Sequence, residues 1–145
     1  MKKLNEMKLT IPSRSVNEGF ARSAVAAFTA LADPTVEELG DLKTAVSEAV
    51  TNCIVHAYRD TCGRIKIDAA LYEGGIIKVR IKDFGCGIAD IEKAMTALYT
   101  TAGEERSGLG FTVMESFTDK LQVRSAPGRG TTVTLTKYLN RKDAK

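Results

Sequence analysis

Three polar residues stand at four-residue intervals in one segment of the chain, at Glu48, Asn52 and His56. Residues four apart in an α-helix lie in one row along the same face. An amide oxygen is a suitable ligand for Mg²⁺, and a neighbouring carboxylate can accept a proton. The spacing therefore makes Asn52 a candidate metal ligand and Glu48 a candidate general base. The solvated polar face of an ordinary amphipathic helix would show the same triplet.

A second group of residues, Asp83-Phe84-Gly85-Cys86-Gly87, follows an apolar stretch that reads as a strand. The carboxylate of Asp83 can accept a hydrogen bond from an exocyclic amine. Gly85 and Gly87 allow the backbone to turn sharply and to approach a planar ligand. Taken alone, the same residues also describe a plain strand exit followed by a turn.

A third group, Arg106-Ser107-Gly108-Leu109-Gly110, precedes a segment with helical character. Free backbone N–H groups at the start of a helix bind anions, and a polyphosphate is the natural ligand for such a site. An ordinary flexible entry into a helix would have a similar composition.

Apolar periodicity predicts the elements that must position these residues. Met7–Ile11 alternates as a half-buried strand does, and helices are predicted over Ser15–Leu31 and about Thr35–Tyr58. Asp33 is the candidate cap of the second helix, with Pro34 in its first turn.

Two hairpins and further helical segments complete the pattern. Strands are predicted at Arg64–Tyr72, Ile76–Lys82, Lys120–Ser125 and Thr131–Leu139, a short helix after Ile88, a weakly patterned stretch over Thr96–Ser107, and a helix at about Gly110–Phe117. Strands and helices segregated in this order indicate an α/β (α+β) two-layer sandwich. We expect a mixed, mainly antiparallel sheet with helices on one face, in a single domain spanning residues 1–145.

Composition narrows the class of protein. The 145 residues include 21 basic and 18 acidic side chains that are interspersed along the chain, for a formal net charge of +3. So small an excess argues against direct nucleic-acid binding. No apolar run is long enough for a membrane span, and the N-terminus lacks a signal-peptide pattern, so we expect a cytoplasmic protein. Three cysteines without a CxxC pair indicate neither a disulfide framework nor a zinc site.

The order and spacing of the three groups, with Gly130-Thr131 before the last strand, resemble the GHKL family of ATPases and kinases over about Asp41–Leu135. The resemblance implies a Bergerat-type α/β sandwich, with ATP bound between the helices and a mobile lid. We place this lid in the stretch Thr96–Ser107. ATP with Mg²⁺ would be the bound species and ADP the product.

The resemblance also implies a role for each matching residue. Glu48 would be the general base and Arg106 a nearby catalytic cation, while Asn52 would hold Mg²⁺. The nucleotide would be bound by Asn52, Asp83, Gly85, Gly87, Gly108, Leu109, Gly110 and Thr131, with Asp83 on the adenine amino group and the amides of residues 108–110 on the phosphates.

Within this family the chain is most similar to bacterial anti-sigma factors of the sporulation type that are also serine kinases. The similarity includes Asn17–Arg22, Val46–Asn52 and Glu105–Thr112. It implies a homodimer that holds a sigma factor inactive with ATP bound and phosphorylates a serine of an anti-anti-sigma protein. Glu18 and Arg22 would then be partner contacts. A solvated helix face is their alternative interpretation.

The sequence also allows other functions, some of which would use the same residues. An anti-sigma kinase of a stress-response pathway, or a non-catalytic switch in which ATP only sets the partner-binding conformation, would use the same pocket. A generic interaction domain would bind no nucleotide. A sensor histidine kinase requires an acceptor histidine on a separate helix pair, whereas the single histidine, His56, lies within the proposed nucleotide helix. A eukaryotic-type protein kinase would need its own glycine-rich loop and two lobes.

Overall fold

The computed structural model describes residues 1–57, 63–85 and 105–139, and of residues 56, 57 and 105–109 only the backbone. Its elements are, in chain order, β1 (Lys3–Pro12), α1 (Asn17–Ala30), α2 (Val36–Asn52), the π-helical turn η1 (Cys53–Ala57), β2 (Arg64–Tyr72), β3 (Ile76–Asp83), α4 (Glu105–Ser116), β4 (Lys120–Ala126) and β5 (Gly130–Tyr138). The short helix predicted after Ile88 falls outside the described residues.

The five strands form one sheet in the order β1-β2-β3-β5-β4. Every neighbouring pair is antiparallel, including the non-consecutive pair β3 and β5. The predicted α/β sandwich is therefore confirmed. A mixed sheet would contain at least one parallel pair of strands. No such pair occurs among the described strands, so the sheet is antiparallel rather than mixed.

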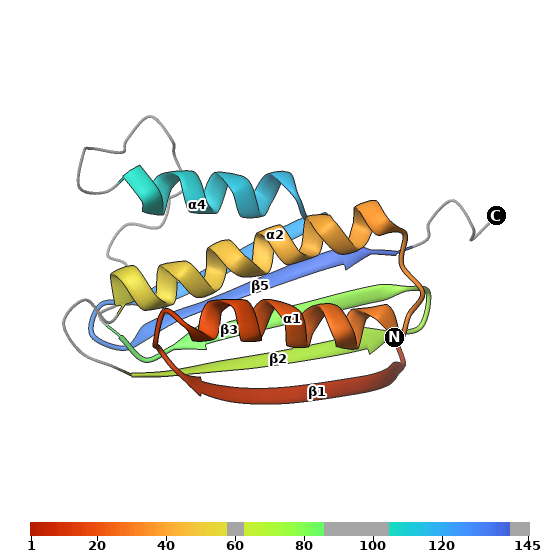
Figure 1. The fold of residues 1–145 in the computed structure, drawn as a ribbon, viewed down its shortest axis with the longest axis horizontal. Coiled ribbons are helices and arrows are strands. Elements are labelled where there is room, and N and C mark those ends of the chain that lie inside the picture. Colours follow the sequence, from red (N-terminus) through yellow and green to blue (C-terminus); the bar gives the residue numbers. More distant parts are fainter. Residues whose placement is uncertain (58–62, 86–104, 140–145) are drawn as a thin grey trace.

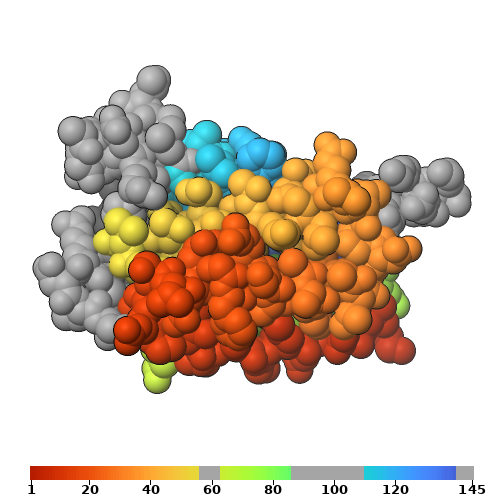
Figure 2. Space-filling view, viewed as in Figure 1, coloured from red at the N-terminus to blue at the C-terminus, as the bar shows by residue number. Residues whose placement is uncertain are grey.

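The helices lie together on one face of this sheet, as Figure 1 shows. α1 and α2 run side by side in opposite directions, and α4 lies beyond α2. Figure 2 shows the red β1 along the lower edge and the helices above it. The opposite face of the sheet carries no helix from the described part of the chain.

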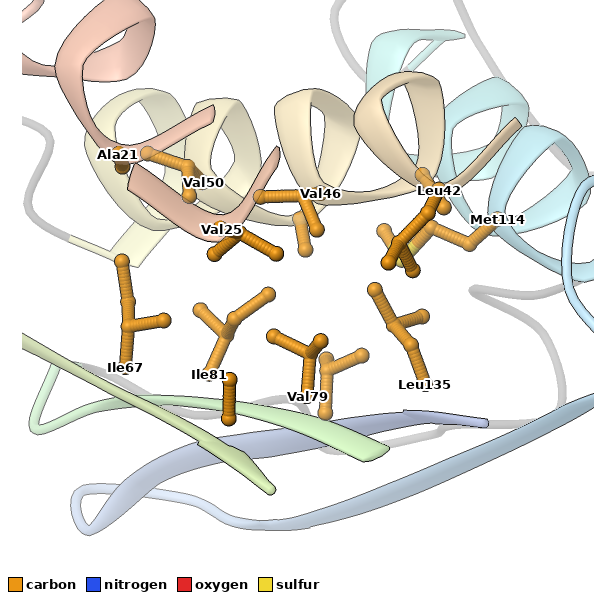
Figure 3. Packing of buried hydrophobic residues seen from close by; sticks show 14 of the residues in the cluster. Ala21, Val25, Leu42, Val46, Val50, Ile67, Val79, Ile81, Met114 and Leu135 are labelled. Carbon is orange, nitrogen blue, oxygen red and sulfur yellow. The ribbon is translucent and has the colours of Figure 1, made fainter. Parts of the chain in front are cut away.

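The core fills the space between the two layers. Figure 3 shows apolar side chains of the helices pointing toward those of the sheet, with Val25, Val46 and Met114 above Val79 and Leu135. All five are buried. This packing follows from the two periodicities in the sequence, 3.6 for the helices and 2 for the strands, since each brings one apolar face to the interface.

Some boundaries differ from the sequence predictions. β1 begins at Lys3 rather than Met7, because an exposed edge strand can pair with β2 along its length without an alternating apolar pattern. The cap of α2 is Thr35 rather than Asp33. Thr35 Oγ1 accepts a hydrogen bond from the Glu38 N–H at 3.0 Å, and Glu38 Oε1 accepts one from the Thr35 N–H at 2.8 Å. This reciprocal pair is a capping box.

The two helices of the expected site also differ from prediction. α2 has α-helical geometry only to Asn52, after which η1 widens to a π-helical turn. π-Turns often occur at functional positions. α4 begins at Glu105 rather than about Gly110, so Gly108 lies inside the helix. Glycine in a helix costs only about 1 kcal/mol, and contact with α2 offsets that cost.

Candidate nucleotide site

The carboxylate of Asp83 lies at the end of β3 and is almost fully buried, with 4% of the residue exposed. Its Oδ1 accepts hydrogen bonds from the backbone N–H of Gly85 at 3.0 Å and of Thr131 at 3.1 Å. The second bond joins β3 to the start of β5. The structure therefore brings together three residues that the sequence assigns to one site.

Burial raises the pKa of Asp83, and the hydrogen bonds from Gly85 and Thr131, together with the Cys53 thiol, act against that rise. Cys53 itself is buried, and its pKa is well above the ordinary thiol value because of burial and the nearby Asp83 carboxylate. Sequence reasoning gave Cys53 no role. Its position one residue after Asn52 and against Asp83 links the end of α2 to the end of β3.

Gly130 belongs to the family resemblance in the sequence, but the sequence predictions gave it no role at the site. Its φ is +103°, and a Cβ at this position would collide with the carbonyl oxygen of Asp83 and lie 2.8 Å from Phe84 Cα. Only glycine allows β5 to pass so close to the end of β3. The turn sequence Pro127-Gly128-Arg129-Gly130 marked a bend, but nothing in it indicated what the second glycine would touch.

Thr131 is positioned by its neighbours as well as by Asp83. Its side chain is buried, and its Oγ1 lies 2.8 Å from Oγ of Ser125 on the adjacent strand. Ser125 also donates a hydrogen bond to the carbonyl of Gly130 at 3.1 Å. These bonds hold the Thr131 hydroxyl against Ser125, while the Thr131 backbone N–H contacts the Asp83 carboxylate.

A second group of predicted residues meets where α2 packs against α4. A Cβ on Gly110 would lie 3.1 Å from Asn52 Oδ1, 3.2 Å from Asn52 Nδ2 and 3.3 Å from Glu48 Oε1. Gly110 is buried, while Asn52 and Glu48 are half-buried. The four-residue spacing on α2 thus places both side chains on the face that α4 covers, and Gly110 provides the room for them.

The side-chain amide of Asn52 has one polar atom that is available to a ligand. Its Nδ2 is buried and has no hydrogen-bond partner among the residues that the structure describes. Buried polar groups are normally paired, so an unpaired one indicates a ligand or ion that completes it. Turning the amide over would place the oxygen there instead, as Mg²⁺ coordination requires.

The described residues contain no group of three or more His, Cys, Asp or Glu side chains arranged to hold a metal ion. A divalent ion bound at Asn52 together with a nucleotide would also have phosphate oxygens and water as ligands. This is the usual arrangement for Mg²⁺ bound with a nucleotide. The residues present fit such an ion.

The two groups lie at the same end of the molecule. Figure 1 shows the end of α2, the end of β3, the start of β5 and the first turn of α4 at one end of the sandwich. Cys53 connects them in the chain, because it follows Asn52 directly and interacts with Asp83. Residues from four separate elements thus converge there.

The remaining predicted residues are placed less completely. Gly87 and most of the predicted lid lie outside the described residues, and Arg106 and Leu109 are described only as backbone within α4. Since α4 begins at Glu105, Gly108 is its fourth residue, and Leu109 and Gly110 lie beyond its first turn. The sequence predicted that these residues stand at the start of a helix. The structure corrects this prediction for Leu109 and Gly110, because the helix begins several residues earlier.

Glu18 and Arg22, the predicted partner contacts, lie on α1. Arg22 Nε is 3.6 Å from Glu18 Oε2, and the Arg22 side chain is 41% exposed. Glu18 Oε2 is buried and accepts no hydrogen bond from the described part of the chain. A partner protein could therefore reach the Arg22 side chain but not this oxygen of Glu18.

Comparison with known proteins identifies the family of this chain. Residues 11–137 match the model of the family described as the histidine kinase-like ATPase domain. The chain therefore belongs to the histidine kinase-like ATPase family. This confirms the resemblance to GHKL proteins.

Individual relatives narrow the class further. The chain is 55% identical over 140 residues to the anti-sigma F factor of Thermoanaerobacter sp. (strain X514), covering 96% of this chain and 97% of the relative. It is 49% identical over 142 residues to the anti-sigma F factor of Bacillus subtilis (strain 168), covering 97% of each chain. The similarity to proteins of that name thus extends over nearly the whole sequence.

Solved structures agree on the fold. The RsbU and RsbW domains of Rv1364c from Mycobacterium tuberculosis match with a TM-score of 0.70 at 20% identity, over 94% of this chain and 33% of that one. The chain therefore spans about a third of that structure. The histidine kinase domain of Erythrobacter litoralis EL346 matches with a TM-score of 0.58 at 21% identity, over 88% of this chain and 63% of that one.

Helices long and apolar enough to cross a bilayer are not found in residues 1–57, 63–85 and 105–139.

Proposed function

We propose that this chain is a cytoplasmic anti-sigma factor of the sporulation type that is also a serine kinase. In its ATP-bound form it would hold a sigma factor inactive, and it would phosphorylate a serine of an anti-anti-sigma protein. The names and near-complete coverage of its relatives support the first part. One observation supports the kinase activity above all: Glu48 and Asn52 on α2 meet Gly110 on α4.

In this proposal the end of β3 binds the base of ATP. Asp83 would accept a hydrogen bond from the exocyclic amine of adenine. The two hydrogen bonds that its carboxylate accepts from the backbone hold it in place for that contact. Gly85, Gly87 and Thr131 would line the plane of the ring. A buried carboxylate that loses its partner pays a large desolvation cost, so this contact gives selectivity as well as affinity.

The junction of α2 and α4 would bind the triphosphate. Mg²⁺ bound at Asn52 would supply positive charge to the phosphates. The unpaired amide of Asn52 supports this role. The backbone of Gly108, Leu109 and Gly110 would contact phosphate oxygens once the first turn of α4 opens, and Arg106 would add a cation nearby.

Glu48 would act as the general base. Phosphoryl transfer needs chiefly positioning and charge stabilisation, so one carboxylate beside the metal ligand is sufficient to take the proton of the attacking serine. The half-buried carboxylate lies one helical turn from Asn52 and next to Gly110. It could therefore reach a hydroxyl that approaches the terminal phosphate.

The acceptor serine would come from the partner protein. Glu18 and Arg22 on α1 would contact that partner or the sigma factor, and the chain would act as a homodimer. The exposed Arg22 side chain supports an interaction role. Glu18 Oε2 is buried 3.6 Å from Arg22 Nε, so Glu18 would hold the arginine in place for that contact.

A phosphate-transfer assay tests the proposal. The full chain, labelled ATP with Mg²⁺ and a purified anti-anti-sigma protein are mixed, and labelled serine phosphate is measured. Glu48→Ala should reduce transfer by about 10²- to 10⁴-fold, the usual contribution of a general base. Capture of the sigma factor should persist in this variant.

Glu115→Ala, which removes an exposed carboxylate on α4, is the matched control. It should leave transfer unchanged. If wild type binds ATP and captures the sigma factor yet transfers no phosphate, the chain is a non-catalytic switch and the kinase proposal is wrong.

A further inference from the structure

The face of the sheet that the helices leave uncovered is strongly basic. Strand residues alternate between the two faces, so the side chains between the buried Ile65, Ile67, Val79 and Ile81 point outward. We call the outward positions of the five strands the open face. Eight exposed basic residues occupy it, namely Lys8, Arg64, Lys66, Lys78, Arg80, Lys82, Lys120 and Arg124.

Only two acidic residues, Glu6 and Asp68, share these positions with the eight basic ones. Because the whole chain has 21 basic and 18 acidic residues, the remainder carries 13 basic and 16 acidic side chains. The small net charge therefore hides a strong separation of charge between the open face and the rest of the molecule.

The two acidic residues are already paired with neighbours. Glu6 Oε1 lies 2.9 Å from Lys3 Nζ, and Asp68 Oδ2 lies 3.3 Å from Arg80. Neither carboxylate forms an ion pair with Lys66 or Lys82, which lie at the centre of the open face. The open face thus keeps an excess of positive charge that nothing within the described residues balances.

At the centre of the open face the basic residues face one another. Lys66 on β2 is paired in register with Lys82 on β3. Directly opposed like charges destabilise a sheet. Arg64 and Lys82 also lie over the ring of Phe84, at 4.5 Å and 5.2 Å from its centroid. Such a cluster carries a stability cost that a bound anion would relieve.

The charges are regularly spaced. Lys78, Arg80 and Lys82 follow one another along β3 at two-residue steps, about 7 Å apart. Three threonines of β5 pair with them in register, and Lys120 and Arg124 lie beyond on β4. Thr136 is buried, whereas Thr132 and Thr134 are half-buried and place hydroxyl groups between the cations of β3 and β4. This grid fits a polymer whose anions recur at regular intervals.

We propose that the open face binds double-stranded nucleic acid through its phosphate backbone, without reading the sequence. Lysine, arginine and threonine side chains are the usual phosphate contacts. Single strands normally bind by stacking bases on exposed aromatic rings. Here the rings of Phe84 and Tyr72 are already occupied by cations, so base stacking is disfavoured. The inference does not depend on the proposed kinase function.

This proposal revises the expectation drawn from net charge. A formal charge of +3 argues against nucleic-acid binding only if the charges are evenly distributed. The alternation of the strands sorts the charges by face, and the local charge decides how a polyanion is attracted.

Fluorescence anisotropy of a labelled 24-base-pair duplex tests the proposal with the full chain. Wild type should bind with a dissociation constant on the order of 10⁻⁵ M at about 50 mM KCl. The logarithm of the binding constant should fall with the logarithm of salt concentration with a slope of about −4, as expected for four or five phosphate contacts. A slope shallower than about −2 in wild type would overturn the proposal without any variant.

Lys66→Glu should weaken duplex binding roughly tenfold and make the slope shallower by about one. The matched control is Lys43→Glu, which makes the same charge change at an exposed position on α2. It should change binding by less than about twofold. Equal weakening by both variants would mean that only net charge matters, and the open face would then have no role.

Competition with poly-glutamate and with a single strand distinguishes duplex binding from binding of other polyanions. Poly-glutamate of matched charge should compete weakly. If it binds more tightly than the duplex and depends on Lys66, the open face is a site for an acidic protein and the nucleic-acid proposal is wrong. Tighter binding of a single strand than of the duplex would also contradict it.

Discussion

Gly110 on α4 lies against the side-chain amide of Asn52 on α2, and a Cβ at position 110 would stand 3.1 Å from Asn52 Oδ1. That separation is tighter than an ordinary van der Waals contact, so any side chain there would push the amide or the neighbouring Glu48 aside. The proposed metal ligand and general base therefore depend on a glycine of another helix.

Gly110→Ala should lower phosphate transfer at least tenfold, because a misplacement of even 1 Å at a catalytic group is costly. Steady-state transfer at saturating Mg-ATP measures the effect. Gly40→Ala is the matched control, since Gly40 lies in α2 with nothing within 4 Å of its Cβ position. The control should keep full activity and gain about 1 kcal/mol of stability. Equal activity in both variants would contradict the role of Gly110.

Gly130→Ala should destabilise the protein by about 3 kcal/mol or more, because it combines a positive φ with a backbone collision at Asp83 and Phe84. Urea unfolding of the nucleotide-free protein gives the change. Gly128→Ala separates the two causes, since Gly128 has a φ of +77° with open space around it. We expect a loss of only about 1 kcal/mol there. If both variants lose the same stability, the collision has no consequence.

Asp83→Asn should weaken binding of Mg-ATP and Mg-ADP by about 1.5 to 3 kcal/mol, the value of a hydrogen bond to a charged group. The asparagine oxygen can still accept from the Gly85 and Thr131 N–H groups, so the backbone should keep its position. Isothermal titration calorimetry measures both affinities. Asp68→Asn, a half-buried aspartate on the open face, should leave them unchanged. Undiminished affinity in Asp83→Asn would exclude this carboxylate from the base site.

The raised pKa of Asp83 predicts a pH dependence of stability. At low pH the carboxyl group is neutral in both the folded and the unfolded state. As the pH rises, the unfolded state ionises first, so the folded state loses relative stability until the pH passes the raised pKa. The free protein should therefore be less stable than its Asp83→Asn variant near neutral pH, and the difference should shrink in acid.

Urea unfolding of both proteins from about pH 8 down to about pH 4 measures this difference. Stability here means the free energy of unfolding without nucleotide. A difference that grows as the pH falls would show that hydrogen bonding to Asp83 outweighs its burial.

Local features of the site were predictable from the sequence. The four-residue spacing of Glu48 and Asn52 and the position of Asp83 at a strand end follow from helix and strand geometry alone, and both are confirmed. The strands β2 and β3 also match prediction closely, because each carries a clear two-residue alternation and a glycine turn joins them.

Contacts between distant segments could not be predicted in the same way. The pairing of β3 with β5 sets Thr131 against Asp83, and the packing of α4 on α2 sets Gly110 against Asn52. Both depend on tertiary register, which periodicity within one segment does not reveal. The start of α4 was missed because its glycines resemble a loop. The open face was missed because net charge was considered instead of the alternating Lys78, Arg80 and Lys82.

The hydrogen bond between Asp83 and Thr131 spans 48 positions of the chain. During synthesis a ribosome must therefore add the whole of α4 and β4, and the beginning of β5, before the carboxylate at position 83 has its second donor. A nascent chain that ends short of Thr131 would hold an unfinished base pocket. Competence to bind nucleotide would then arise only after Thr131 has been added and β5 has begun to pair with β3.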